Sequence, residues 1–474
     1  MSKLYVFGIG GTGSRVINSL IMLLASGVEI NATEIVPIII DPDQSAGNKT
    51  DCIQHINRYN IIRNALKFDS TTRNKFFKTA LNTDVVSNCE IILQHTNTQK
   101  FGEYINYSGL SSENQAFVST LFSEKNLSSD MKDGFKGNPN VGSVVLNQFG
   151  NSSEFESFAN SFQQGDRIFV VSSIFGGTGA SGFPLLVKNI RGIDSNKPNA
   201  ELIREAPIGA ITVLPYFRLN NDSASEIDSS TFISKTKAAL AYYDNHLTET
   251  NVHYYIGDNV GKKYNNCEGG GDQRNDAHLI EFLSALSIID FMDIPQKLFA
   301  NQTLYKEYGL DPSYKNDTDS VIFANLPSQT RNLVQKAMTQ WFYFGKYLDE
   351  QMNNTEIAPQ PWFNDLHLDD NHFVNTSYYS FLLEFHRDYS QWLAEMSENS
   401  RAFCPFDLRE DKDHLFELVK GVSPKKRLGS KNYAYFNKLL NEFVVKMNQN
   451  NVEQQFVELF YSATEIIWNK KFNH

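Results

Sequence analysis

A glycine-rich segment close to the start of the chain is the first candidate for chemistry. The stretch VFGIGGTGSRV (6–16) contains the pattern G-x-G-x-x-G at Gly8, Gly10 and Gly13. It follows an apolar run and precedes a helical pattern, so it predicts a strand, a tight turn and a helix. Backbone N–H groups at such a turn can hold a phosphate at the helix N-terminus. The motif indicates a nucleotide but does not say which one.

A second glycine loop narrows the choice of ligand. The stretch VVSSIFGGTGASGFPLLV (170–187) again reads as strand, loop and helix, with Gly176, Gly177, Thr178 and Gly179 at the turn. A Rossmann dehydrogenase needs one loop for its pyrophosphate. Two anion-binding loops at the carboxyl edge of one sheet suit a nucleoside triphosphate better.

Between the two glycine loops lies DGFKGNPNVGS (133–143), whose residues are typical of a turn. Its position between the two glycine loops makes it informative, because it is one of several segments that occur in a recognisable order. Five segments in one order resemble the tubulin/FtsZ superfamily, across residues 3–291. They are the first glycine loop, IIIDPDQ (38–44), GNPNVG (137–142), FGGTGASGFP (175–184) and QRNDAHLIEFLSAL (273–286).

The resemblance implies a ligand and a set of roles. The ligand would be GTP or GDP with Mg²⁺. The phosphate-binding residues would be Gly8, Gly10, Gly11, Thr12, Gly13, Asn138, Gly142, Gly176, Gly177, Thr178 and Gly179. Asp43 would lie near the water ligands of Mg²⁺, which prefers hard oxygen donors. Asn275 and Asp276 would read the guanine base, although no aromatic residue stands just ahead of them to stack on it.

The sequence departs from the family in two places. The family's G-x-x-N-x-D loop, whose acid activates water in the next subunit, is not recognisable; Asp290 and Asp293 are the weak candidates for a catalytic acid. The last third of the chain also reads as helical, where the family has a mixed sheet. The chain is therefore most similar to divergent prokaryotic tubulin-like proteins, some of which resemble parts of bacterial defence or conflict systems. Self-assembly through the nucleotide face is implied, with slow GTP hydrolysis left open.

The elements that must position these residues follow from the hydrophobic pattern. Apolar runs at 3–9, 34–40, 166–174, 208–216 and 252–257 predict buried strands. Because helical patterns follow several of them, we expect an α/β fold with a doubly wound, mostly parallel sheet. The expected domains are a nucleotide-binding domain at 1–273 with a polar insertion at about 50–132, a central helix at 274–294, and a mainly α-helical domain at 295–474. Aromatic-rich helical stripes support the last of these.

Composition excludes several classes of protein. The chain has 474 residues, which suggests two domains, and a net charge of −11, which does not favour nucleic acid as a partner. No signal peptide or membrane span is evident. The four cysteines are scattered without a C-x-x-C pair, so neither zinc nor a disulfide framework is expected. We expect a cytoplasmic protein that associates with itself, as a homo-oligomer or filament, and that could bind another protein through its helical part.

Two alternatives stay open at this stage. The first is an NAD-dependent oxidoreductase with a Rossmann domain, using Gly8, Gly10 and Gly13 for the pyrophosphate and Asp41 for the ribose. It leaves the second glycine loop and the GNPNVG segment unexplained. The second alternative is a nucleotide-gated structural scaffold without turnover.

Overall fold

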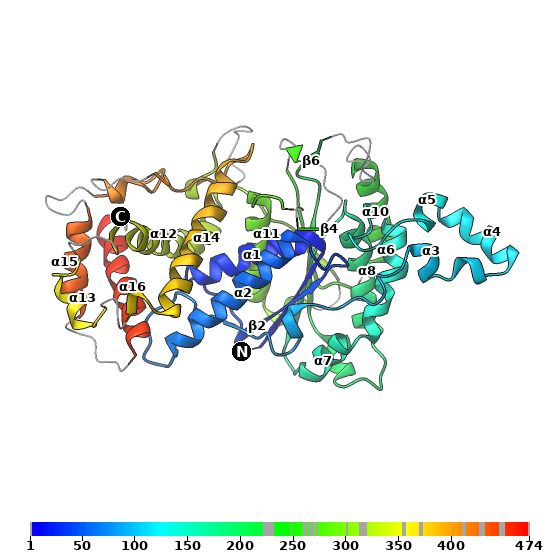
Figure 1. Cartoon of the computed structure of the whole chain (residues 1–474), viewed down its shortest axis with the longest axis horizontal. Coiled ribbons are helices and arrows are strands. Elements are labelled where there is room, and N and C mark those ends of the chain that lie inside the picture. Colours follow the sequence, from blue (N-terminus) through cyan, green and yellow to red (C-terminus); the bar gives the residue numbers. More distant parts are fainter. Residues whose placement is uncertain are drawn as a thin grey trace.

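The protein is built around a parallel β-sheet. In the computed structural model, which describes residues 2–220, 232–247, 249–258, 263–264, 270–271, 274–299, 302–311, 320–352, 357–368, 373–409, 414–425, 432–444 and 451–472, the strand order of the main sheet is β3-β2-β1-β4-β5-β7-β9. Neighbouring strands in this sheet pair in parallel (Figure 1). The strands are β1 (Leu4–Ile9), β2 (Glu34–Ile40), β3 (Ala80–Leu81), β4 (Arg167–Ser173), β5 (Ile208–Val213), β7 (Val252–Ile256) and β9 (Leu304–Glu307). A small second sheet pairs β6 (Arg218–Leu219) with β8 (Lys263–Tyr264).

Helices cover both faces of the main sheet, and β1 shows why. Leu4 and Val6 belong to one hydrophobic core, whereas Tyr5, Phe7 and Ile9 belong to another on the opposite face. This alternation is the period-two pattern of a strand that is buried on both sides. The first core includes residues of α1 (Gly10–Ala25), α2 (Gly47–Leu66) and α11 (Leu279–Asp293), and the second includes residues of α6 (Pro139–Val145), α7 (Ser153–Ser161), α8 (Gly177–Arg191), α9 (Ala200–Glu205) and α10 (Phe232–His246).

The predicted α/β class and the five predicted strands are confirmed. The observed strands β1, β2, β4, β5 and β7 fall within or match the predicted runs. The short strands β3 and β9 were not predicted from the sequence. Because β9 pairs with β7, the sheet continues past residue 295, where the second domain was expected to begin.

The C-terminal part is mainly helical, as predicted. Its helices are α12 (Ser328–Gln351), α13 (Pro361–Asp365), α14 (Ser377–Ser397), α15 (Tyr433–Val444) and α16 (Val452–Lys471). Aromatic side chains join this part to the first, since Trp341 of α12 is fully buried and its ring lies 5.2 Å from that of Phe77. One hydrophobic core therefore extends from α1 and α2 into the helical part.

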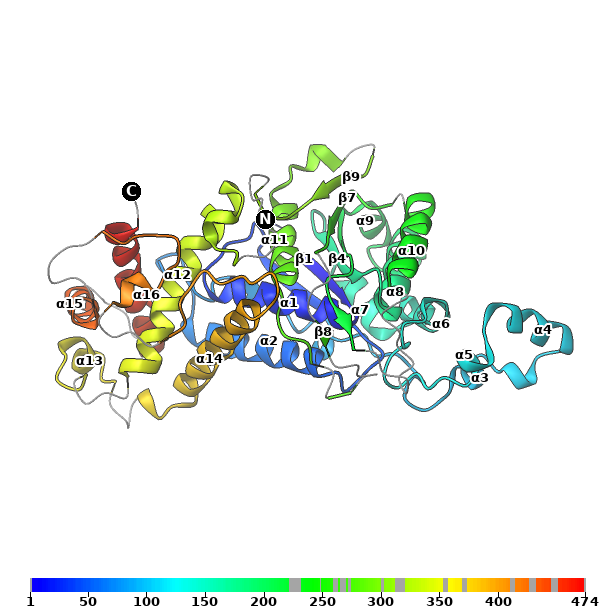
Figure 2. The same ribbon diagram turned by 90° about the horizontal axis from the view of Figure 1, so that it is seen from above.

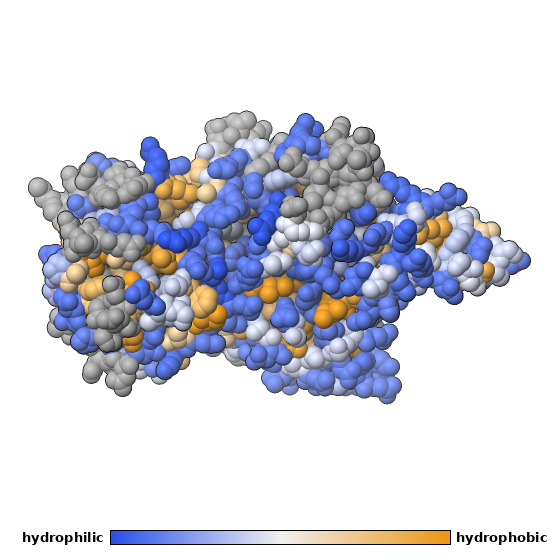
Figure 3. Space-filling model, in the orientation of Figure 1, coloured by the Kyte–Doolittle hydropathy of each residue, from blue (hydrophilic) through white to orange (hydrophobic). Residues whose placement is uncertain are grey.

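Part of the polar insertion forms an arm that projects from the body of the protein (Figures 1 and 2). The arm carries the helices α3 (Phe101–Tyr104), α4 (Ser112–Leu121) and α5 (Glu124–Leu127). No residue of α4 is buried, and Phe117 and Leu121 are 64% and 53% exposed. Apolar groups on the face shown in Figure 3 are small and separated from one another. Among the described residues no helix has the length and apolar character needed to cross a bilayer.

A buried histidine in the sheet predicts a pH dependence of stability. His253 of β7 bonds Thr212 of β5 at 2.8 Å, and burial lowers its pKa to about 3. The unfolded chain binds a proton near pH 6.5 but the folded chain does not, so stability is lost as pH falls. We expect the free energy of unfolding to fall by about 1.5 kcal/mol between pH 6.5 and 5 from this residue.

The measurement is chemical denaturation of the wild type and His253→Gln across this pH range. The variant should lose part of the pH slope, whereas His246→Gln, at an exposed position, should keep it. An unchanged slope in His253→Gln would contradict this account.

Candidate functional site

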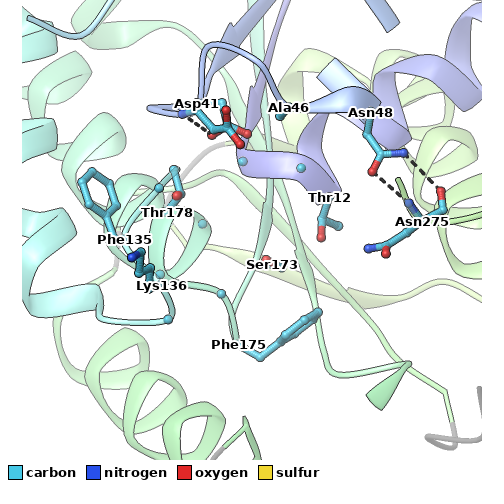
Figure 4. Close-up of a pocket in the computed structure, with 18 of the residues that line it drawn as sticks. Thr12, Asp41, Ala46, Asn48, Phe135, Lys136, Ser173, Phe175, Thr178 and Asn275 are labelled. Carbon is cyan, nitrogen blue, oxygen red and sulfur yellow. Dashed lines mark hydrogen bonds between the residues drawn. The ribbon is translucent and has the colours of Figure 1, made fainter. Parts of the chain in front are cut away.

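A cavity of about 330 Å³ lies at the carboxyl ends of the central strands (Figure 4). Segments that are far apart in the sequence line it, namely the start of α1, the turn after β2, residues 133–137 and the loop before α8. Among the predicted site residues, those that line this cavity are Gly10, Gly11, Thr12, Asp43, Gly176, Gly177, Thr178, Gly179 and Asn275. The two glycine loops and the predicted base-binding segment therefore meet at one place.

Two helices begin at this cavity. Helix α1 starts at Gly10 and α8 at Gly177, and neither has a side chain that caps its first turn. A Cβ atom built on Gly10 would lie 3.4 Å from the Cβ of Thr178, so the two helix starts are in contact. The first-turn N–H groups of a helix lack partners within the helix and carry partial positive charge. Their meeting at one cavity favours an anion with several oxygens.

Three predicted phosphate-binding glycines do not line the cavity, and each lies where two elements pack closely. A Cβ on Gly13 would lie 2.5 Å from the carbonyl carbon of Gly8, and one on Gly142 would lie 2.3 Å from Oγ of Ser181. Gly8 and Gly13 thus let α1 approach β1, and Gly142 lets α6 approach α8. Asn138, the N-cap of α6, is also absent from the lining, although its neighbour Gly137 is present.

The two aspartates after β2 have different environments. Asp43 accepts hydrogen bonds from the N–H of Ser45 at 2.9 Å and of Gly270 at 2.7 Å, so it holds the turn together. Asp41 also lines the cavity, and its Oδ1 accepts from the N–H of Asp43 at 3.1 Å. Its Oδ2 has no hydrogen-bond partner among the described residues. Burial raises the pKa of Asp41 to about 7, against the opposing effect of Lys49.

Asn275 lines both the first cavity and an adjoining polar cavity, whereas Asp276 lines the polar cavity and not the first one. Side-chain atoms of Asn48 bond both the N–H and the carbonyl oxygen of Asn275, each at 3.1 Å (Figure 4). The carboxamide of Asn275 makes no hydrogen bond within the described residues and lines the first cavity. Asp276 lines a second, polar cavity of about 520 Å³ between α1, α2 and α14.

The segment that carries this pair is not helical. The central helix, expected from residue 274, begins at Leu279 because the residue before it acts as a cap. The ring Nδ1 of His278 accepts from the N–H of Ile280 at 3.1 Å, and Glu281 accepts from the N–H of His278 at 3.0 Å. Asn275 and Asp276 therefore lie outside the helix, in the chain ahead of α11.

Two features of the cavity were not predicted from the sequence. Five aromatic residues line it, at Phe135, Phe175, Phe217, Phe232 and Tyr264. The Phe217 ring lies 5.4 Å from that of Tyr264 and 5.5 Å from that of Phe175, in edge-to-face contacts. No local motif marks Phe217, Phe232 and Tyr264, which come from the chain before β6, the start of α10 and the small second sheet. Phe135 and Phe175 lie in stretches that were recognised for their glycines and not for these rings.

The second feature is a buried polar network beneath the cavity. Arg15 of α1 donates to Glu281 of α11 at 2.5 Å and to the hydroxyl of Tyr216 at 2.8 Å. Tyr216 donates to the same carboxylate oxygen of Glu281 at 2.5 Å. The sequence signal for this network was the position of Arg15 in the first glycine-rich stretch (6–16). The network fixes the start of α11 against α1.

The candidate catalytic acids lie at the other end of α11. Asp290 accepts from the hydroxyl of Tyr254 at 2.6 Å and pairs with Lys306. Asp290 and Asp293 line a third cavity, of about 930 Å³, between α11, β7 and α12. About 15 Å of helix separates them from the residues near the first cavity. Within one molecule they do not contribute to that cavity.

The chain is similar to solved structures of FtsZ and CetZ proteins, which belong to the family that the motifs resemble. It is 15% identical to a point mutant of FtsZ from M. jannaschii, over 54% of this chain and 46% of that chain, with a TM-score of 0.27. It is 12% identical to CetZ2 from Haloferax volcanii in a GTPγS-bound protofilament, over 62% of this chain and 60% of that chain, with a TM-score of 0.29.

For GDP-bound monomeric CetZ1 from Haloferax volcanii the identity is 12%, over 64% of this chain and 65% of that chain, with a TM-score of 0.29. The chain thus spans less than two thirds of each of these proteins. No protein-family model and no curated protein sequence matches it.

The contrast between packing glycines and cavity glycines gives a prediction. Gly13→Ala should destabilise the fold by about 1–3 kcal/mol, because its Cβ meets the backbone of Gly8. Gly11→Ala in the same turn should leave stability unchanged, because its Cβ would be 3.5 Å from Arg15, an ordinary contact. Thermal unfolding of both variants checks this, and equal melting temperatures would contradict it.

Proposed function

We propose that this chain binds a nucleoside triphosphate in the first cavity, with GTP the expected ligand, and associates with itself through the face that carries this cavity. The observation that supports it most is the meeting of the uncapped N-termini of α1 and α8 at one place. A triphosphate has enough oxygens to accept from both helices at once. A Rossmann dinucleotide site uses one glycine loop for its pyrophosphate. The presence of a second loop therefore favours a triphosphate over a dinucleotide.

The phosphates would lie against Gly10, Gly11 and Thr12 on one side and Gly177, Thr178 and Gly179 on the other. Lys136 lines the same cavity and adds positive charge near this position. Asn138 would act from the start of α6, just behind Gly137. Gly8, Gly13 and Gly142 would support the loops through packing rather than touch phosphate.

The base would lie at the end of the cavity that Asn275 lines. The free carboxamide of Asn275 offers one donor and one acceptor to the edge of a base. Phe217 and Tyr264 offer faces or edges for stacking. The guanine preference is inferred from the resemblance of Asn275 and Asp276 to the family's base-reading pair. Asp276 lies on the adjoining polar cavity, so the base would have to extend toward that cavity to contact it.

A Mg²⁺ ion would fit beside the phosphates through Asp41 rather than Asp43. Within the described ranges no three His, Cys, Asp or Glu side chains could hold a metal ion alone, so the ion would take most of its ligands from phosphate and water. Asp41 has an unused carboxylate oxygen at the cavity, whereas Asp43 is bonded to two backbone N–H groups. The ion would neutralise phosphate charge.

This assignment predicts different behaviour for two neighbouring variants. Mg²⁺ is expected to increase the affinity for the nucleotide in the wild type. In Asp41→Asn this increase should be about tenfold smaller. Asp43→Asn should lower the melting temperature, because the turn loses its acceptor, but should keep the Mg²⁺ effect. Calorimetric titration with and without Mg²⁺ measures both. A Mg²⁺ effect lost only in Asp43→Asn would reverse the assignment.

Hydrolysis by this chain would need an acid from a second molecule. Asp290 and Asp293 are the candidates that the resemblance offers, because they lie at the end of α11 remote from their own cavity. A scaffold that binds nucleotide without turnover fits the same geometry. A role in a bacterial defence system rests on the resemblance alone.

NAD is the second candidate ligand, because Asp41 at the end of β2 lines the cavity beside the first glycine loop. Calorimetric titration with GTP, ATP, GDP and NADH separates the candidates, and sedimentation in each nucleotide tests assembly. We expect GTP to bind and to increase the pelleted fraction. Binding of NADH without GTP would refute the main proposal, and pelleting independent of nucleotide would refute controlled assembly.

A further inference from the structure

Residues 274–277 form one wall of the cavity, which Arg274 and Asn275 line; we call them the wall segment. Side chains from α2, from α14 and from the turn after α14 hold this segment in place. On one side Asn48 of α2 bonds the N–H and the carbonyl oxygen of Asn275. On the other side the N–H of Ala277 donates to Glu395 of α14 at 2.8 Å, and Asn399 donates to the carbonyl oxygen of Ala277 at 2.7 Å. Side chains thus satisfy backbone groups that secondary structure would otherwise satisfy.

The bond from Asn399, in the turn after α14, is buried, and the bond to Glu395 of α14 is partly buried. Ala277 is 7% exposed and Asn399 is 6% exposed. Glu395 is itself held by Gln391, one turn earlier on α14, at 2.9 Å. Loss of the partner of a buried backbone group destabilises the folded state. The wall segment therefore depends on α14 for its position.

Helix α14 is in turn fixed to the nucleotide-binding half, beside α2 (Figures 1 and 2). Asp388 pairs with Arg58 and lies 3.3 Å from His55, both on α2. Trp392 donates to Ser19 of α1 at 3.3 Å. Beyond the helix, Nε of Arg401 lies 2.8 and 2.9 Å from the two carboxylate oxygens of Asp258, after β7. A shift of α14 would be carried to the wall segment.

The helical C-terminal part is connected to the cavity through the hydrogen bonds that Glu395 and Asn399 make with Ala277. Among the described residues, the lining of the first cavity ends at Asn275, so nothing after it in the chain lines the cavity. The bonds from Glu395 and Asn399 lie two residues from Asn275 in the chain. They link the helical part to the end of the cavity where the base would lie.

We propose that Glu395 and Asn399 are positioning residues through which the helical C-terminal part sets the affinity for the nucleoside end of the ligand. The inference rests on the proposed function. The phosphates would lie against the starts of α1 and α8, and neither Glu395 nor Asn399 lines the cavity there. The affinity for the phosphates should therefore not depend on these two side chains. By linkage, a ligand that orders the wall segment also stabilises α14.

The test is calorimetric titration of the full chain with GTP and with inorganic tripolyphosphate. Glu395→Ala and Asn399→Ala should weaken GTP binding about tenfold, the loss expected for one buried hydrogen bond. Tripolyphosphate binding should stay as in the wild type. Glu395→Gln keeps an oxygen acceptor for Ala277 and should restore most of the GTP affinity.

A matched control is Glu384→Ala, which removes the same charge from α14 where it pairs with Arg58, away from the wall segment. It should leave GTP binding unchanged. Hydrogen exchange adds a readout that general destabilisation would not mimic. GTP should slow exchange at residues 391–399 in the wild type and not in Asn399→Ala.

The outcomes separate the two proposals. Wild-type protein that binds neither GTP nor tripolyphosphate would overturn the proposed function and this inference with it. Wild-type protein that binds GTP, with Glu395→Ala and Asn399→Ala equal to it, would overturn only the positioning role. An equal loss for GTP and tripolyphosphate would also overturn it, because the effect would then be general.

Discussion

The site depends on the fact that β1 and β4 are neighbours in a parallel sheet. Strand β1 runs directly into α1, and β4 leads into α8 through residues 174–176, so the positive ends of the two helices lie side by side. Two such ends repel each other, and only a negatively charged ligand or water relieves that repulsion. The sheet order thus places two positive helix ends at one cavity before any side chain is considered. The residues around it then refine which anion fits.

The sequence predicted the parts of the fold that are buried on both faces. Strands such as β5 are continuous apolar runs, and no helical period competes with them. The two-residue strand β3 and the mostly exposed β9 carry no such signal, because pairing with a neighbour, and not burial, makes them strands. The arm could not be predicted for a similar reason. Its polar helices have no apolar face wide enough to mark them.

The lining of the cavity was predicted where its residues are contiguous in sequence and missed where they are not. The glycine loops are contiguous in sequence, so their role as helix starts could be recognised. Asp41 and Asp43 are two residues apart, and the choice between them depends on a bond from Gly270, which is remote in the chain. The position of Asn275 likewise depends on Asn48, and Phe217, Phe232 and Tyr264 come from separate elements with no common motif.

The buried network of Arg15, Glu281 and Tyr216 has a consequence for how this sequence can change over time. Loss of either charged partner alone would leave an uncompensated charge in the interior, at a cost of about 3–5 kcal/mol. Replacement of both by apolar residues of similar volume would cost far less. Positions 15 and 281, which are 266 residues apart, are therefore expected to vary together in any lineage that keeps this fold. A single descendant change at either position would be selected against before its partner could follow.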